Sequence, residues 1–226
     1  MNLSEYMVLN LVIVFFPLAL SFDRKVAFFR KWKLVFPVIM LTALPFILWD
    51  ALVTGRHWYF NESYTLPFRP LGIPLEEILF FITVPYAVLF IWEVLTSYRL
   101  GSLRSLGGLY IPIQLLLTVS GIFSIMKGWE YPLIVILFLI AMIEFQHRLV
   151  DSIFFTGRFM VFLLILSVLI LIFNGFLTCR PVVLYNEAFK TGVKIFTIPV
   201  EDFFYGISLA GWNIALFEFF KKRGAQ

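Results

Sequence analysis

The chain has 226 residues, of which 61% are hydrophobic and 14% are charged, and 28 are phenylalanines. A soluble domain is about half apolar and about a quarter charged, so this composition indicates an integral membrane protein and excludes soluble enzymes and disordered binding proteins. A net charge of +4 in such a chain marks one side of a bilayer rather than a nucleic-acid site, and a single cysteine excludes an intramolecular disulfide.

Seven apolar stretches approach the length of about 20 residues that a helix needs to cross the hydrocarbon core of a bilayer. In chain order they cover residues 3–21, 34–53, 77–97, 106–126, 131–146, 159–178 and 201–220. The first stretch lacks a basic start, so we predict a retained span rather than a signal peptide. The pattern predicts an all-α integral membrane protein with seven transmembrane helices.

Basic residues are distributed unevenly between the connections. Twelve of the 18 lysines and arginines lie after the first, third and fifth spans or at the C-terminus, and six lie in the other connections. Cytoplasmic loops carry an excess of basic residues. The sequence therefore predicts a multi-pass protein of the cell membrane, with its N-terminus outside and its C-terminus in the cytoplasm.

The sequence contains an internal repeat of three spans. At an offset of 124 or 125 residues the matched pairs are Asp50 and Asn174, Asn61 and Asn186, Glu62 and Glu187, Pro74 and Pro199, Glu76 and Glu201, and Glu77 and Asp202. Because a single span connects the two units, the chain returns to its starting side of the membrane before the second unit begins. Both units therefore have the same orientation and are parallel repeats. We therefore predict a first repeat at residues 1–98, a connector helix at 99–128 and a second repeat at 129–226.

Paired acids open the third and the seventh spans. Acids in the first turn after a proline suit a helix start, because the helix dipole favours negative charge there. One acid would be enough for a helix start, yet both spans begin with two consecutive acids before a long apolar run. Ionisable groups at membrane depth indicate function. Burial away from water favours the neutral form of a carboxyl group, and the neutral form can donate a proton. The candidate catalytic residues are Glu76, Glu77, Glu201 and Asp202.

Helical spacing places an aromatic ring and a hydroxyl on the same face as Glu76 and as Glu201. The candidate substrate-binding residues on these faces are Phe80, Thr83, Tyr205, Ser208 and Trp212. Aromatic rings there could stabilise a cation. Glu77 and Asp202 lie about 100° round their helices, so they could support their neighbours or react themselves.

Further matched residues could support the site. Asp50 and Asn174 could hydrogen-bond the acids, or cap helices and be solvated at the interface. The two Asn–Glu pairs could cover a cavity or form turns, and the two prolines suit helix starts. These supporting candidates are Asp50, Asn61, Glu62, Pro74, Asn174, Asn186, Glu187 and Pro199.

Several cofactor chemistries have no counterpart in the sequence. It has no Gly-x-Gly-x-x-Gly dinucleotide motif, and two histidines cannot form a histidine-rich di-iron site. The four aspartates do not cluster as a magnesium diphosphate site requires, and the seventh span has no lysine for a retinal Schiff base. We expect no metal and no cofactor, which leaves chemistry that acids perform inside an apolar pocket.

The sequence Pro-Leu-Glu-Glu followed by Ile-Leu-Phe-Phe, with a second copy that reads Pro-Val-Glu-Asp-Phe-Phe-Tyr, resembles the membrane lycopene cyclases of the heterodimeric type. The resemblance is to the form in which both repeats are fused, and it extends over nearly the whole chain. Gly206 stands where the first copy has Phe81, which leaves one or two rings per substrate open.

The resemblance implies an intramolecular lyase or isomerase that acts without a cofactor or net redox change. It would convert the acyclic ψ-end groups of lycopene or a related acyclic carotenoid into rings, with β-rings as the expected product. An acid would protonate C2, the C5–C6 double bond would attack the C1 cation, and a base would remove a proton. Glu76 and Glu201 are then the first choice as acid and base, with Glu77 and Asp202 as their partners.

Other interpretations of these residues stay open. Parallel repeats and membrane acids also suit a small transporter or a lipid-binding scaffold. A cyclase for longer carotenoids would share every motif described above. The expected partners are the carotenoid substrate and membrane lipid, with no nucleic acid, and association with other carotenoid-pathway enzymes is compatible with a membrane-bound substrate.

Overall fold

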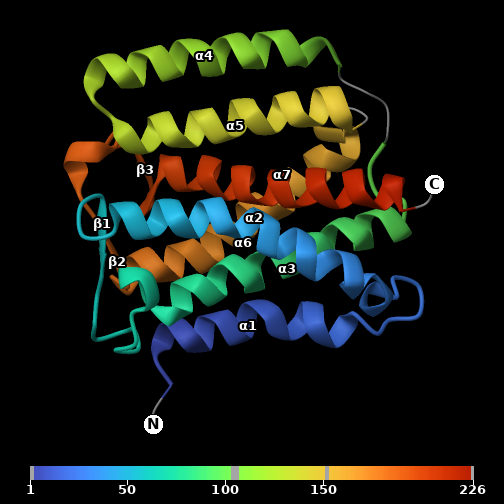
Figure 1. The fold of residues 1–226 in the computed structure, drawn as a ribbon, viewed down its shortest axis with the longest axis horizontal. Helices are drawn as coiled ribbons and strands as arrows, with labels where there is room; N and C mark the ends of the chain where they lie inside the picture. Colours follow the sequence, from blue (N-terminus) through green and yellow to red (C-terminus); the bar gives the residue numbers. More distant parts are fainter. Residues whose placement is uncertain (1–2, 103–106, 151–152, 225–226) are drawn as a thin grey trace.

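The computed structural model describes residues 3–102, 107–150 and 153–224, which fold as a bundle of seven long helices (Figure 1). The helices are α1 (Glu5–Leu20), α2 (Trp32–Val53), α3 (Leu75–Ser97), α4 (Tyr110–Lys127), α5 (Glu130–Leu149), α6 (Gly157–Cys179) and α7 (Val200–Arg223). The short strands are β1 (Trp58–Phe60), β2 (Val183–Tyr185), β3 (Lys194–Ile195) and β4 (Ile198–Pro199). The predicted all-α membrane class is confirmed.

Each of the seven predicted stretches forms a helix, and six of these helices are long and apolar enough to cross a membrane. The exception is α1, whose 16 residues span about 24 Å at about 1.5 Å per residue, less than the hydrocarbon thickness of about 30 Å. The side chain of Ser4 caps its first turn, and the N–H of Ser21 bonds the carbonyl of Leu18 at its end. Leu106, the predicted start of the fourth span, lies outside the described residues.

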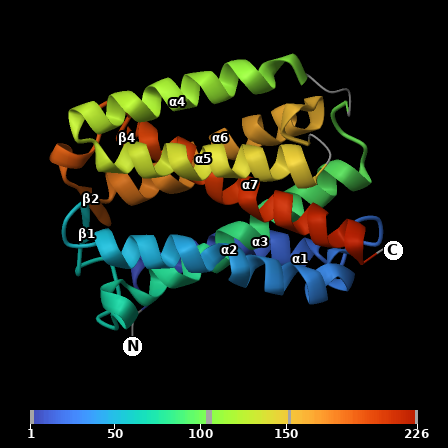
Figure 2. The same cartoon turned by 45° about the horizontal axis from the view of Figure 1, so that its top comes forward.

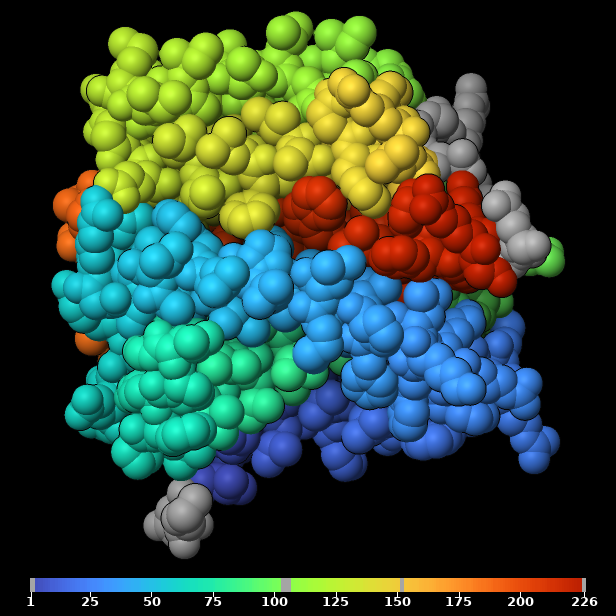
Figure 3. Space-filling model, viewed as in Figure 1, coloured from blue at the N-terminus to red at the C-terminus, as the bar shows by residue number. Residues whose placement is uncertain are grey.

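The two acid-bearing helices, α3 and α7, contact each other in the middle of the bundle. α1 packs on α3 and α5 packs on α7, while α2 contacts both central helices and crosses the face between them (Figures 1 and 3). These contacts are related by the repeat, since α1 with α3 corresponds to α5 with α7. Each half therefore contributes one central helix and one outer helix in the same arrangement.

The connector helix α4 lies at the edge of the bundle and packs against α5 (Figure 2). Of its residues, Gly121 and Ser124 are buried. Its exposed large apolar side chains are Ile111, Leu115, Leu116, Val119, Ile122, Phe123, Ile125 and Met126. Such a surface is stable against lipid tails and unfavourable in water.

The two halves also meet through a pair of strands at one end of the bundle, here called the strand end (Figure 1). β1 and β2 pair in antiparallel fashion, with Tyr59 opposite Leu184. These two residues are equivalent in the repeat, because 125 positions separate them. The equivalent strands of the two halves thus bind each other across a pseudo-two-fold axis.

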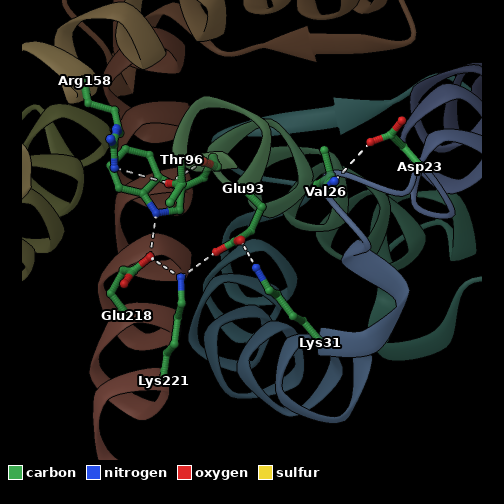
Figure 4. A network of polar contacts seen from close by, with 9 residues as sticks. Asp23, Val26, Lys31, Glu93, Thr96, Arg158, Glu218 and Lys221 are labelled. Carbon is green, nitrogen blue, oxygen red and sulfur yellow. Dashed lines mark hydrogen bonds and ion pairs between the residues drawn. The ribbon is translucent and has the colours of Figure 1, made fainter. Parts of the chain in front are cut away.

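The opposite end is held by ion pairs between the central helices and the segment before α2 (Figure 4). Glu93 of α3 is 1% exposed and accepts hydrogen bonds from Lys31 and, at 2.8 Å, from Lys221 of α7. Its repeat equivalent Glu218 accepts the indole N–H of Trp92 at 2.9 Å and also contacts Lys221. Charged groups from both halves are therefore linked at this end.

Candidate active site

A cavity of about 340 Å³ lies between α1, α3, α6 and the first turns of α7, and it reaches β1 and β2. Its volume falls within the range of about 300–1,000 Å³ that is typical of small-molecule sites. Most of its wall is apolar, and its polar and amphipathic residues gather towards the strand end. These are Tyr6, Asp50, Trp58, Glu77, Tyr131, Asn174, Tyr185, Asp202 and Tyr205.

One carboxyl group from the first turn of each central helix lines this cavity, and a tyrosine binds each of them. The phenol of Tyr6 donates to Oε2 of Glu77 at 2.5 Å, and the phenol of Tyr131 donates to Oδ1 of Asp202 at 2.8 Å. Tyr6 and Tyr131 are 125 positions apart, as are the two acids. Glu77 is 9% exposed and Asp202 is 6% exposed. The two halves therefore build the same tyrosine–acid pair, α1 onto α3 and α5 onto α7.

The two acids differ in their remaining hydrogen bonds. Oδ2 of Asp202 accepts the phenol of Tyr185 at 2.6 Å and the amide of Asn174 at 2.8 Å. Burial raises the pKa of Tyr185, and the charge of Asp202 raises it further, so this phenol remains a donor. Among the described residues, Tyr6 is the one side chain that donates to Glu77. Three donors stabilise Asp202 as an anion, whereas Glu77 has less support for its charged form.

Asp50, the repeat equivalent of Asn174, adds a third carboxyl group to the wall. Its Oδ1 accepts the indole N–H of Trp58 at 2.7 Å, and its Oδ2 has no hydrogen-bond partner within the described part of the chain. Three carboxyl groups in one apolar wall cannot all be ionised at low cost, so the cluster is suited to hold a proton. In the described ranges, no group of three His, Cys, Asp or Glu residues has the arrangement of a metal site.

The other member of each acid pair binds a loop instead of lining the cavity. Oε1 of Glu76 accepts the N–H of Leu66 at 2.6 Å and the hydroxyl of Ser4. Oε1 of Glu201 accepts the N–H and the hydroxyl of Thr191 at 2.6 and 2.7 Å. Leu66 and Thr191 are equivalent in the repeat. Both carboxylates thus fasten the preceding loop to the start of a central helix.

The sequence favoured Glu76 and Glu201 as the reacting groups, and the structure places their neighbours in the cavity wall. The lining face of α3 follows Glu77 through Val84 and Val88. Phe80 and Ala87 lie on the face predicted from Glu76 and also line the cavity, so the two faces overlap and the lining face is turned towards Glu77. The prolines before the acids, Pro74 and Pro199, stand directly before α3 and α7, as their helix-start chemistry predicts.

The predicted substrate-binding residues divide into two groups. Phe80 and Tyr205 line the cavity beside the acids. Thr83 does not line it and donates to an asparagine of α1 at 2.7 Å, and Ser208 is fully buried without a hydrogen-bond partner among the described residues. Trp212 lines a second, smaller cavity between α2, α5 and α7.

The supporting residues of the outer loops form mainly local contacts, and Asn186 also donates its side-chain amide to the carbonyl of Arg56 in the other half at 3.0 Å. Oδ1 of Asn61 and Oδ1 of Asn186 each accept a backbone N–H two residues further on, at 3.0 and 3.1 Å, as in an Asx turn. Glu187 pairs with two lysines of its own loop, and Glu62 is exposed. Their recurrence therefore accompanies a repeated turn at the strand end.

Four aromatic partners of the acids were not among the residues predicted from the sequence. Tyr6 and Tyr131 carry a signal, because they match at the same offset as the acids. Trp58 and Tyr185 carry none, because their equivalents in the other half are not the same residue types. They reach the acids because β1 and β2 pair at the strand end.

A family model described as lycopene cyclase matches residues 4–95 and again residues 129–220. The chain belongs to this family. The two matched segments begin 125 residues apart and also end 125 residues apart, so each three-helix repeat is matched once and α4 lies between them. The family assignment confirms the resemblance seen in the sequence and supports a carotenoid cyclase function. No curated protein and no solved structure matches the chain.

Proposed function

We propose that the chain is a lycopene cyclase that converts acyclic ψ-end groups into rings, with β-rings as the expected product, and that it needs no cofactor. The observation that supports this most is the pair of tyrosine-bound acids, Glu77 and Asp202, in the wall of one apolar cavity. The reaction gains one proton and loses one, so it needs an acid and a base but no oxidant. The two acids supply both groups.

The different surroundings of the acids suggest their roles. Neutral Glu77 would donate its proton to C2 of the end group, which leaves a cation at C1. The electrons of the C5–C6 double bond then form the C1–C6 bond and move the charge to C5. Asp202, stabilised as an anion by three donors, would remove the proton from C6 to give a β-ring. Return of this proton to Glu77 completes the cycle.

The wall also suits the cationic intermediates. The rings of Phe80 and Tyr205 line the cavity next to the acids. The electron-rich face of an aromatic ring attracts a cation, more strongly where water is excluded. An apolar wall also excludes water, which could otherwise add to the cation at C1 or C5 and yield an alcohol.

We further propose that the protein spans the cell membrane with its N-terminus outside and its C-terminus in the cytoplasm. The excess of lysine and arginine in the connections opposite the strand end supports this orientation. Membrane lipid would then surround α4 and the outer faces of α1 and α2, and the substrate would reach the cavity from the bilayer. The acids would lie near the outer surface.

Expression in bacteria that accumulate lycopene tests the activity. We expect chromatography of the extracted pigment to show products with one or two rings. Unchanged lycopene in cells whose membranes contain the protein would contradict the proposal. Proton-dependent solute uptake into liposomes, together with unchanged lycopene, would favour the transporter interpretation instead.

The tyrosines offer a second test. Tyr6 would stabilise the carboxylate that forms on Glu77 as its proton moves to C2, and Tyr131 holds the Asp202 carboxylate in place. Tyr6→Phe and Tyr131→Phe should each lower the rate of ring formation about tenfold, because a hydrogen bond to a charged group contributes about 1.5–3 kcal/mol. Tyr59→Phe is the matched control, since Tyr59 lies in β1, is 48% exposed and is absent from the cavity wall. Wild-type rates in both variants, at equal protein levels, would show that the tyrosine–acid pairs play no part in the reaction.

A further inference from the structure

The smaller cavity is the repeat counterpart of the larger one. It has a volume of about 240 Å³ and lies between α2, α5 and α7. All of its lining residues except Leu41 have equivalents in the wall of the larger cavity. The pairs are Thr42 and Leu166, Pro45 and Leu169, Phe46 and Ile170, Phe138 and Ile13, Trp212 and Ala87, and Leu216 and Ile91. The same groove therefore occurs twice, each time between helices of both halves. The larger cavity is called the first groove here and the smaller cavity the second groove.

An aromatic stack narrows the second groove where the first is open. Phe46 of α2 and Phe138 of α5 lie with ring centroids 4.8 Å apart and an interplanar angle of 21°. At the equivalent positions the first groove has Ile170 on α6 and Ile13 on α1. Two aliphatic side chains thus replace a stacked pair of rings that bridges the two helices.

A third difference between equivalent positions also narrows the second groove. Trp212 donates its indole N–H to the carbonyl of Phe138 at 3.2 Å, which fixes its ring beside the stack. The first groove has Ala87 at this position. No acid of the described part of the chain lines the second groove, whereas Asp50, Glu77 and Asp202 line the first.

The first groove also extends to the surface of α1. Val12 and Phe16 line it although they are 48% and 64% exposed, so its wall continues onto the side of the bundle that faces lipid. Its other end reaches the acids near β1 and β2. This groove therefore connects the lipid-facing surface to the acid cluster along the interface of α1, α3 and α6.

We propose that the groove between α1, α3 and α6 is the binding site for the extended polyene chain, and that its counterpart between α2, α5 and α7 is closed to substrate by Phe46, Phe138 and Trp212. This inference rests on the proposed function. The long apolar chain lies along the groove and continues into lipid, while one end group reaches the acids. A molecule with two reactive ends is therefore cyclised at one end at a time. It leaves the groove before its second end enters.

Exchange of residues between the equivalent positions tests this assignment. The double variant Ile13→Phe with Ile170→Phe copies the aromatic stack into the first groove, and Phe138→Ile removes it from the second. Both changes are made in the Glu77→Gln background, so that lycopene is bound without turnover, and the lycopene that remains with the purified protein is measured by absorbance. We expect Ile13→Phe with Ile170→Phe to lower this retention at least tenfold and Phe138→Ile to leave it unchanged.

The same exchanges with Glu77 intact separate the two proposals. Ring formation should cease in the double variant and continue in Phe138→Ile. If the double variant both retains and cyclises lycopene, the groove assignment is overturned while the cyclase proposal stands. If the chain with Glu77 forms no ring but retention still depends on Ile13 and Ile170, the groove assignment stands and the cyclase proposal fails. Should the double variant be absent from membranes, Ala87→Trp, which copies Trp212, provides the same test.

Discussion

Glu77→Gln is expected to lower ring formation at least about 100-fold, because a general acid or base contributes about 10²–10⁴ to a rate. Glutamine keeps the shape of the side chain and can still accept the hydrogen bond of Tyr6. It has no proton to give to an alkene carbon. Asp202→Asn should cause a similar loss, because an amide cannot take up the proton that the ring releases. The measurement is cyclised product per unit of protein in membranes that contain lycopene.

Glu76→Gln is the matched control, because it makes the same change at the adjacent residue. The carboxylate of Glu76 accepts from the backbone N–H of Leu66 and the hydroxyl of Ser4, and an amide oxygen can accept both bonds. Glu76→Gln should therefore keep most of its activity. An inactive Glu76→Gln beside an active Glu77→Gln would reverse the assignment and restore the choice that the sequence alone favours.

The double variant Lys31→Met with Lys221→Met is expected to destabilise the protein by about 3 kcal/mol, the low end for a buried charge that loses its partners. Glu93 is 1% exposed, and both lysines contact its carboxylate from different elements (Figure 4). Each lysine is about one-third exposed, which weakens the pairing and keeps the expected loss at that end of the range. Thermal unfolding of the purified protein in detergent measures the change as a lower Tm.

A third substitution provides the control for this prediction. Glu93→Gln in the double variant removes the unpaired charge, so Tm should recover towards the wild-type value. An unchanged Tm in the double variant would show that the ion pairs are well solvated and contribute little. A Tm that falls but does not recover with Glu93→Gln would point to lost packing of the lysine side chains instead.

The seven helices could be predicted from the sequence because the bilayer imposes length and hydropathy on each span, and the repeat because matched polar residues recur at an offset of 124 or 125 positions. The side of each helix that faces the cavity could not be predicted in the same way. In a soluble protein an apolar stripe marks the buried face, but in a membrane both the lipid-facing and the inner surfaces are apolar. The first turn of α3 shows the result, since helical spacing could not rank Glu76 against Glu77 and the family resemblance led to Glu76 as the first choice.

The choice between these two acids depends on groups far from them in the sequence. The N–H of Leu66 binds Glu76 from the preceding loop, and the phenol of Tyr6 binds Glu77 from the first helix. Residues 71 positions apart meet here because α1 packs on α3. The tyrosine could have been found from the repeat, whereas Trp58, which binds Asp50 in the same wall, depends on how two short strands pair.

The position of α4 at the edge of the bundle has a consequence for how the two halves diverged. α4 tethers two units that bind each other through their own strands and central helices, so it raises their effective concentration and fixes their ratio at one to one. In a dimer of identical subunits every substitution appears twice, and a ring that filled one groove would fill both. In the tethered pair a change enters one copy alone. Positions 46 and 138 can therefore hold phenylalanines while the equivalent positions 170 and 13 hold isoleucines.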